Sequence, residues 1–301
     1  IAGIVLAILF IPDLRAAEHS SFDFVGFALI GPGLSLLLAG ASLLGVDGVS
    51  AWWVFATILV GAVLITAYVR YALRRMDALI DLNLLSIPSF RIAAWGGFLF
   101  RVGVGATPFL LPLMLQEGLG FSAVNSGLIT FISGAGALTM KALAPPILAR
   151  FGFRRVLIAN AVVATLLAAA PAVFVLGLPV AAMVAILFAG GLTRSLQFTS
   201  LTLVIFSDIK EEALSRASTF AATLQELSGT VGIAIAALVL QAGQHLTGSP
   251  GLEARHFVGS FLAIGLIAVS SLLVLPKLEE GTGAAMIARR KQPPAGKDDA
   301  A

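Results

Sequence analysis

The stretch Ile92–Leu115 reads IAAWGGFLFRVGVGATPFLLPLML and contains a single charged residue, Arg101. About 20 consecutive apolar residues let an α-helix cross a bilayer, so this stretch predicts a transmembrane helix. Arg101 follows Arg91 by ten residues, which places it about 15 Å into the membrane at about 1.5 Å per residue. An arginine at that depth costs about 3 kcal/mol on insertion scales, and such residues usually face a bundle interior or a water-filled cavity.

Apolar runs of this kind recur along the whole chain. Of its 301 residues, 58% are hydrophobic and 12% are charged, against about 25% charged residues in a typical soluble domain. The mean hydropathy is +1.00. We therefore predict an all-α polytopic membrane protein. Eight full spans are expected, at Phe22–Leu44, Ala51–Arg70, Ile92–Leu115, Val124–Leu148, Val156–Leu176, Val180–Phe206, Leu214–Gln241 and Phe257–Leu275.

The two ends of the chain differ from its middle. Ile1–Ile11 is apolar but too short to cross a bilayer, so we expect the end of a truncated helix and the C-terminal part of a longer protein. The last residues are rich in glycine, proline and charge, which predicts a disordered tail. The expected organisation is residues 1–21 for the truncated helix and a loop, 22–70 for two linker helices, 71–91 for a cytoplasmic loop with a short interfacial helix, 92–276 for a C-terminal six-helix bundle, and 277–301 for a cytoplasmic tail.

Basic residues gather in alternate loops. Of the 19 lysines and arginines, fifteen fall in loops on one side of the predicted membrane, and only Arg255 falls in the opposite loops. The positive-inside rule makes the basic side cytoplasmic, so the C-terminus is expected in the cytoplasm. The remaining three, Arg101, Lys141 and Arg194, lie within spans, where Lys141 is near enough to the cytoplasmic end to snorkel.

The sequence offers no catalytic or metal-binding pattern. The chain has no cysteine, and its three histidines have no metal-ligand spacing. We find no nucleophile–base set and no glycine-rich phosphate loop. The net charge of +3 comes from dispersed loop residues. We therefore expect no catalytic residues, no metal, no cofactor and no nucleic-acid partner.

Two further spans carry charge near mid-depth. Arg194 lies near the centre of Val180–Phe206, and Gln197 shares its helix face. Glu226, next to Gln225, follows Arg216 by ten residues and so has the same expected depth as Arg101. We predict that Arg101, Arg194 and Glu226 line one water-accessible cavity on a substrate or proton pathway, with Gln197 and Gln225 beside them.

Structural roles remain open for the same residues. The arginines and Gln197 could instead hold helices together through hydrogen bonds. Glu226 could exchange protons, or it could form a constant ion pair with Arg101 or Arg194.

Small residues and prolines accompany these charges. Glycine permits close helix approach, and proline removes a backbone donor and kinks a helix. The predicted packing or hinge positions are Gly103, Gly105, Pro108, Pro112, Gly229 and Gly232.

Three stretches carry a family pattern: residues 109–127, residues 149–155, and residues 215–218 together with 225–232. They resemble the fourteen-helix drug–proton antiporter branch of the major facilitator superfamily. FLLPLMLQEGLGFSAVNSG, residues 109–127, is similar to the ninth and tenth helices of that branch. ARFGFRR, residues 149–155, is similar to the cytoplasmic loop motif of its second half, which implies motif roles for Arg150, Gly152, Arg154 and Arg155. SRAS at 215–218, followed by QELSGTVG at 225–232, is similar to the start of its thirteenth helix.

Two positions depart from the family pattern. Ala149 replaces an acidic residue of the loop motif, so the charge interaction of that residue is lost or replaced. Glu226 stands where the family more often has an amide, so a protonatable group there would belong to a subgroup.

The resemblance implies a major-facilitator-like C-terminal six-helix bundle, preceded by two linker helices. It also implies proton-coupled export of drugs or other small amphipathic molecules by alternating access, in the bacterial inner membrane. The implied partners are the lipid bilayer, a small-molecule substrate, protons and an N-terminal six-helix half. Two alternatives stay open. Two arginines against one acid would suit an importer of an anionic solute, and a membrane-embedded sensor or scaffold would have no transport cycle.

Overall fold

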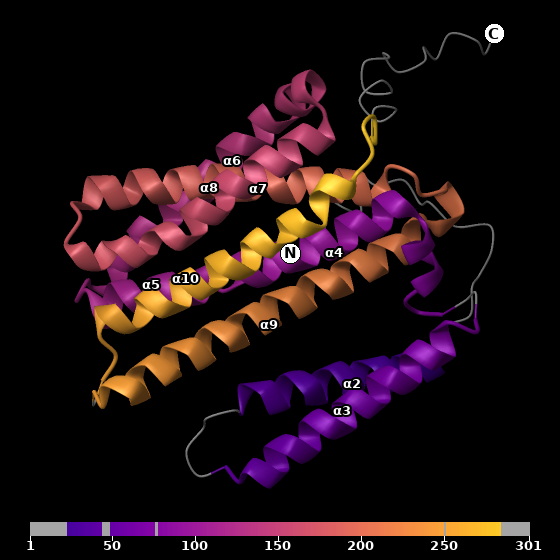
Figure 1. Ribbon diagram of the computed structural model, residues 1–301, viewed down its shortest axis with the longest axis horizontal. Helices are drawn as coiled ribbons and strands as arrows, with labels where there is room; N and C mark the ends of the chain where they lie inside the picture. The colour runs from indigo at the N-terminus through magenta and orange to yellow at the C-terminus, as the bar shows by residue number, and fades with distance from the viewer. Residues whose placement is uncertain (1–22, 44–48, 76–77, 250, 284–301) are drawn as a thin grey trace, which may run out of the picture.

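The computed structural model describes residues 23–43, 49–75, 78–249 and 251–283. Within these ranges the secondary structure is helical, with no strand (Figure 1). Seven described helical segments are long and apolar enough to cross a membrane. The predicted all-α polytopic class is therefore confirmed. The expected truncated helix in residues 1–21 lies outside the described residues.

The helices follow the predicted spans closely. α2 (Phe24–Ser42) is apolar but shorter than the seven membrane-length segments. The others are α3 (Ala51–Ala72), α4 (Pro88–Gly105), α5 (Thr107–Leu113), α6 (Ala123–Phe151), α7 (Phe153–Ala169), α8 (Val180–Phe206), α9 (Leu214–Thr247) and α10 (Ala254–Ser270). Short 3₁₀ segments, Ala170–Leu176 after α7 and Leu275–Lys277 after α10, extend two of the spans.

The core of the molecule is built around α4. This helix packs against α8, α9 and α10, while α6 and α7 pack against α8. In Figure 1, α4 and α10 run side by side, with α9 on one flank and the group α6, α7 and α8 on the other. A residue on α4 can therefore face three different helices, which makes this helix the natural place for a buried site.

Proline breaks the helix that the sequence predicted as one span from Ile92 to Leu115. α4 ends at Gly105, and α5 begins with Pro108 in its first turn, where the missing N–H leaves no intrahelical bond unmade. Pro112 lies inside α5, and a π-helical turn, Met114–Gly118, follows it. Turns of this type widen a helix locally and are frequent at functional sites.

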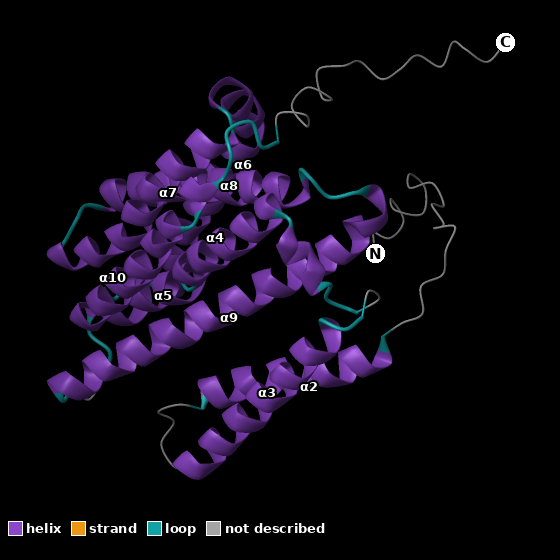
Figure 2. Cartoon of the chain, turned by 45° about the vertical axis from the view of Figure 1, so that its right-hand side comes forward, coloured by secondary structure: helices purple, strands orange, loops and turns teal. Residues whose placement is uncertain are grey.

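The loop before α4 ties the α2–α3 hairpin to the bundle. The hydroxyl of Tyr68 accepts a 2.6 Å hydrogen bond from the backbone N–H of Ile80, and Asp81 pairs with Arg216 of α9 at 3.3 Å. Instead of the expected interfacial helix, the described part of this loop holds a short 3₁₀ turn, Leu82–Ser86. In Figure 2 the hairpin lies beside α9 and is joined to the bundle by loops at one end.

The chain after α10 differs from the expected tail, which was to start at Lys277. Leu278 is buried, Glu280 pairs with Arg154, and Gly283 lies against Phe153. Packing therefore continues through residue 283, because an apolar side chain and a counter-charge hold these residues on α7. Residues 284–301 lie outside the described residues.

Candidate functional site

Arg101 lies inside the bundle on α4 with only 6% of its surface exposed. Its guanidinium carbon is 5.3 Å from the centre of the Phe198 ring on α8, a cation–π contact. Gly97, one turn earlier, leaves room for the side chain, since a Cβ there would lie 3.2 Å from Nη1 of Arg101. Within the described chain, Nε of Arg101 is buried without a hydrogen-bond partner, and no carboxylate pairs with the guanidinium. Among the described residues, no acidic side chain neutralises the charge of Arg101.

Arg194 lies on α8, close to the same helix contact. Its Nη2 donates a 3.0 Å hydrogen bond to Oγ of Ser133 on α6. A cavity of about 30 Å³ adjoins it, and its lining includes Val104 of α4. This is room for a water molecule. Phe198 follows Arg194 by one helical turn, so the two arginines flank one contact between α4 and α8.

The hydrogen-bond partners of Gln197 connect two helices. Its side chain is fully buried, and its Oε1 accepts a 2.8 Å hydrogen bond from Nδ2 of Asn160 on α7. Asn160 also donates to the carbonyl of Thr193 at 2.8 Å, while Nε2 of Gln197 donates to the carbonyl of Leu157 at 3.3 Å. This network joins α7 to α8. Sequence reasoning missed Asn160, although a lone amide in an apolar span was a usable signal.

Glu226 differs from both arginines in its exposure. Its side chain and that of Gln225 are exposed on α9, and neither Arg101 nor Arg194 forms an ion pair with it in the described structure. Ser218 and Ala222 are exposed on the same helix. The structure thus places Arg101 and Arg194 at one helix contact and leaves Glu226 exposed on α9, and the cavity shared by all three stays a prediction. The constant ion pair is not formed by the described residues.

The glycines near these charges lie at close helix contacts. A Cβ on Gly103 would lie 2.5 Å from the carbonyl oxygen of Ile264 on α10, and one on Gly105 would lie 3.1 Å from Cα of Gly229 on α9. Gly232 faces the backbone of Val102. These positions let α9 and α10 approach α4 closely on either side of Arg101.

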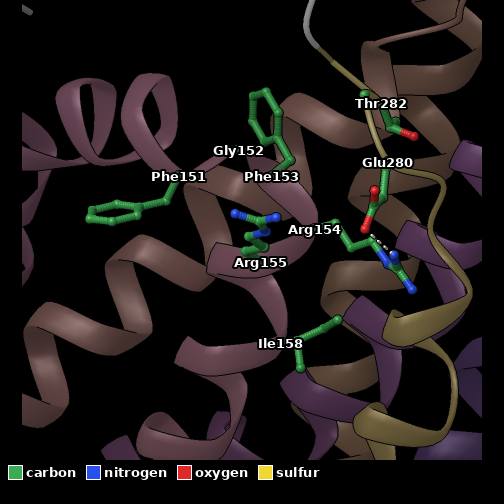
Figure 3. A pocket seen from close by; sticks show the side chains of 9 residues that line it. Phe151, Gly152, Phe153, Arg154, Arg155, Ile158, Glu280 and Thr282 are labelled. Carbon is green, nitrogen blue, oxygen red and sulfur yellow. Dashed lines mark hydrogen bonds and ion pairs between the residues drawn. The ribbon is translucent and has the colours of Figure 1, made fainter.

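The predicted loop motif lies at the turn between α6 and α7. Gly152 adopts a φ of 76°, a conformation that favours glycine, and it separates the two helices. Arg154 donates to the carboxylate of Glu280 at 2.9 Å and to the carbonyl of Pro276 at 3.0 Å, so Glu280 supplies a charge partner within this motif (Figure 3). Arg150 lies over the ring of Phe151 at 5.5 Å, and Arg155 is exposed. Among the described residues, no group of three or more histidines and acids could hold a metal ion.

The membrane-length apolar helices, with Arg101 buried between them, define an integral, multi-pass membrane protein. No family model matches the chain. Over 97% of its length it is 29% identical to a Citrobacter koseri protein and 27% identical to one from Klebsiella pneumoniae. Over 92% of its length it is 28% identical to a Pectobacterium atrosepticum protein. All three relatives carry the name multidrug resistance protein MdtD.

The chain spans 62%, 62% and 60% of the length of these three relatives, respectively. The resemblance predicted from the motifs is therefore confirmed as a similarity to multidrug resistance proteins along nearly the whole of the chain.

Proposed function

We propose that the chain is part of a secondary active transporter that exports small amphipathic molecules, drugs among them, by alternating access. The observation that carries the proposal is the pair of arginines at the α4–α8 contact, with no described carboxylate beside them. The name of the relatives supports the substrate class. Because the chain spans 62% of the first relative, the transporter we propose includes a second six-helix half that completes the pathway.

A buried cation is costly in a membrane and is usually kept for a function. Arg101 has one aromatic face as its described partner, and Arg194 has one hydroxyl and a water-sized cavity. Both groups can therefore accept a negative charge that arrives with a substrate, or one that the other half presents in one of two states. Such a differential contact is what an alternating-access cycle requires.

We propose Glu226 as the group that exchanges protons. Its carboxyl and the amide of Gln225 are exposed near mid-span on α9. Exposure of these groups to lipid would be unfavourable, so in the whole protein this face of α9 is proposed to meet a polar pathway. A carboxyl there can be protonated from one side of the membrane and can release its proton on the other.

The proposed setting is the bacterial inner membrane, with the basic loops and the C-terminus in the cytoplasm. The bias of fifteen basic loop residues against one supports this orientation.

The test is transport by the full-length protein in sealed vesicles with an imposed pH gradient. We expect efflux of a cationic, lipophilic dye that depends on the gradient and is lost in Arg101→Met. Uptake of an anionic solute instead would favour an importer, which the two arginines without an acid also suit. No flux of either probe, in vesicles that maintain their gradient, would favour a sensor or scaffold.

A further inference from the structure

Two hollows meet where α6 turns into α7. The first has a volume of about 340 Å³ and a mixed lining, in which the charged residues Arg154, Arg155 and Glu280 lie beside apolar side chains (Figure 3). The second also has a volume of about 340 Å³, but its lining is mainly apolar and includes Val156, Ala159 and Val163. Phe151 and Arg155 line both hollows. The two hollows together therefore form one surface with a charged end and an apolar end.

The charged end has an available cation. Arg154 is held by Glu280 and the carbonyl of Pro276, whereas Arg155 is exposed and has no ion pair or hydrogen bond within the described part of the chain. In Figure 3, Arg154 points toward Glu280 and Arg155 points the other way, on the side of Phe151. Glu280 is thus already paired, and Arg155 leaves an uncompensated positive charge between the two hollows.

The position of these hollows matches the boundary of a membrane. α6 ends at Phe151 and α7 starts at Phe153, and both belong to membrane-length apolar segments. The hollow that contains the charged residues therefore lies at the level where the spans meet water. The apolar hollow continues along α7 to Val163, on the outer surface, where Ala159 and Val163 are exposed.

We propose that this surface binds a glycerophospholipid with an anionic headgroup. Arg155 pairs with the headgroup phosphate, and one acyl chain lies in the apolar hollow along α7. Charge complementarity selects an anionic headgroup at the membrane surface, and the adjoining apolar lining selects a lipid over a free anion. Neither hollow is lined by Arg101 or Arg194, so the site is distinct from the two arginines of the proposed pathway.

The experiment uses the full-length protein reconstituted in vesicles of phosphatidylethanolamine with a minor fraction of phosphatidylglycerol. The protein is released in mild detergent, and the retained phospholipids are identified by native mass spectrometry. We expect retention of phosphatidylglycerol over phosphatidylethanolamine. Arg155→Gln should weaken that retention about fivefold, the factor for one basic side chain at an anionic surface. Ala159→Trp, which fills the apolar hollow, should weaken it as well.

Each variant has a matched control on an exposed position outside both hollows. Arg91→Gln on α4 removes the same charge, and Ala142→Trp on α6 adds the same ring; neither should change retention. Both test positions are exposed, and size-exclusion profiles check that all variants fold. Loss in Arg155→Gln but not in Ala159→Trp would mean that a free anion binds, and would overturn the lipid site. Equal loss in the controls, no loss in either test variant, or equal retention of phosphatidylethanolamine would overturn it too.

Discussion

At the scale of single residues, substitution of Arg101 should affect transport without lowering the stability of the fold. No described carboxylate pairs with Arg101, so Arg101→Met removes a buried charge and leaves no unpaired carboxylate buried in its place. Replacing buried charges by apolar groups of similar size is often neutral or stabilising. We expect an unchanged or higher melting temperature together with at least about a tenfold loss of efflux.

Arg154→Met is the matched control for that measurement. It breaks the pair with Glu280 and the hydrogen bond to Pro276, so it should lower the melting temperature. A clear fall in the melting temperature of Arg101→Met, with efflux unchanged, would assign Arg101 to packing alone.

Substitution of Glu226 can distinguish proton coupling from substrate binding. Glu226→Gln keeps the shape of the side chain and removes its ability to change charge. We expect it to abolish efflux driven by a pH gradient while substrate binding stays largely intact, as measured by flux and by equilibrium binding on the same preparation. Full gradient-driven efflux in the variant would place proton exchange on other carboxyls.

A third residue predicts a pH dependence outside the membrane. The hydrogen bond from Ser249 and the charge of Arg255 hold the pKa of Glu253 below its ordinary value of 4.5. A lowered pKa in the folded state means that the ionised carboxylate stabilises the loop at higher pH. That contribution is lost as the pH falls below 4.5 and through the folded-state pKa. The protection factor for hydrogen exchange in the first turn of α10 should therefore fall with acid more in the wild type than in Glu253→Gln. An equal acid response in both proteins would contradict this account.

At the scale of elements, close glycine contacts set the spacing of α4 and α10. A methyl group on Gly103 would meet the backbone of Ile264 and the side chain of Ala268. Overpacking of this kind typically costs about 1–3 kcal/mol, so Gly103→Ala should lower the midpoint of thermal unfolding.

Gly134→Ala on α6 tests the same chemical change without the contact, because a Cβ there meets nothing within 4 Å. Alanine is favoured over glycine inside a helix, so this variant should be neutral or slightly stabilising. Equal effects of the two substitutions would show that the contact at Gly103 is loose.

Helix positions could be predicted from the sequence far better than helix partners. The bounds of α8 agree with the predicted Val180–Phe206, because a long apolar run between loop residues defines both ends. The predicted start of α7 at Val156 is three residues too late, because Phe153 and the two arginines after it form the first turn of the helix.

In the candidate site, too, the sequence predicts positions within a helix but not the contacts between helices. Periodicity states which residues share one face of a helix, so it placed Gln197 beside Arg194. It does not state which neighbouring helix that face meets. The hydrogen bonds from Asn160 to Gln197 and the exposure of Glu226 both depend on that tertiary arrangement.

At the scale of the whole molecule, the charge bias between loops predicts the orientation. These 301 residues contain no cysteine, so a single introduced cysteine is the one thiol that they contribute, and it reports its own side of the membrane. Lys210 lies in a predicted cytoplasmic loop, and Leu246, which is 88% exposed, lies near the opposite end of α9. In intact cells, a membrane-impermeant thiol reagent should label Leu246→Cys and leave Lys210→Cys unlabelled until the membrane is opened. The reverse pattern would invert the proposed topology.

The attachment of the chain after α10 to the start of α7 has a practical consequence for protein production. Leu278, Glu280 and Gly283 each contact or cover the bundle, so the folded unit extends beyond its last helix. A version shortened to end at Pro276 would leave Arg154 without its carboxylate and would uncover the face that Leu278 now shields. Affinity tags and fusion partners are therefore best joined after Gly283, where their removal by a protease leaves these contacts intact.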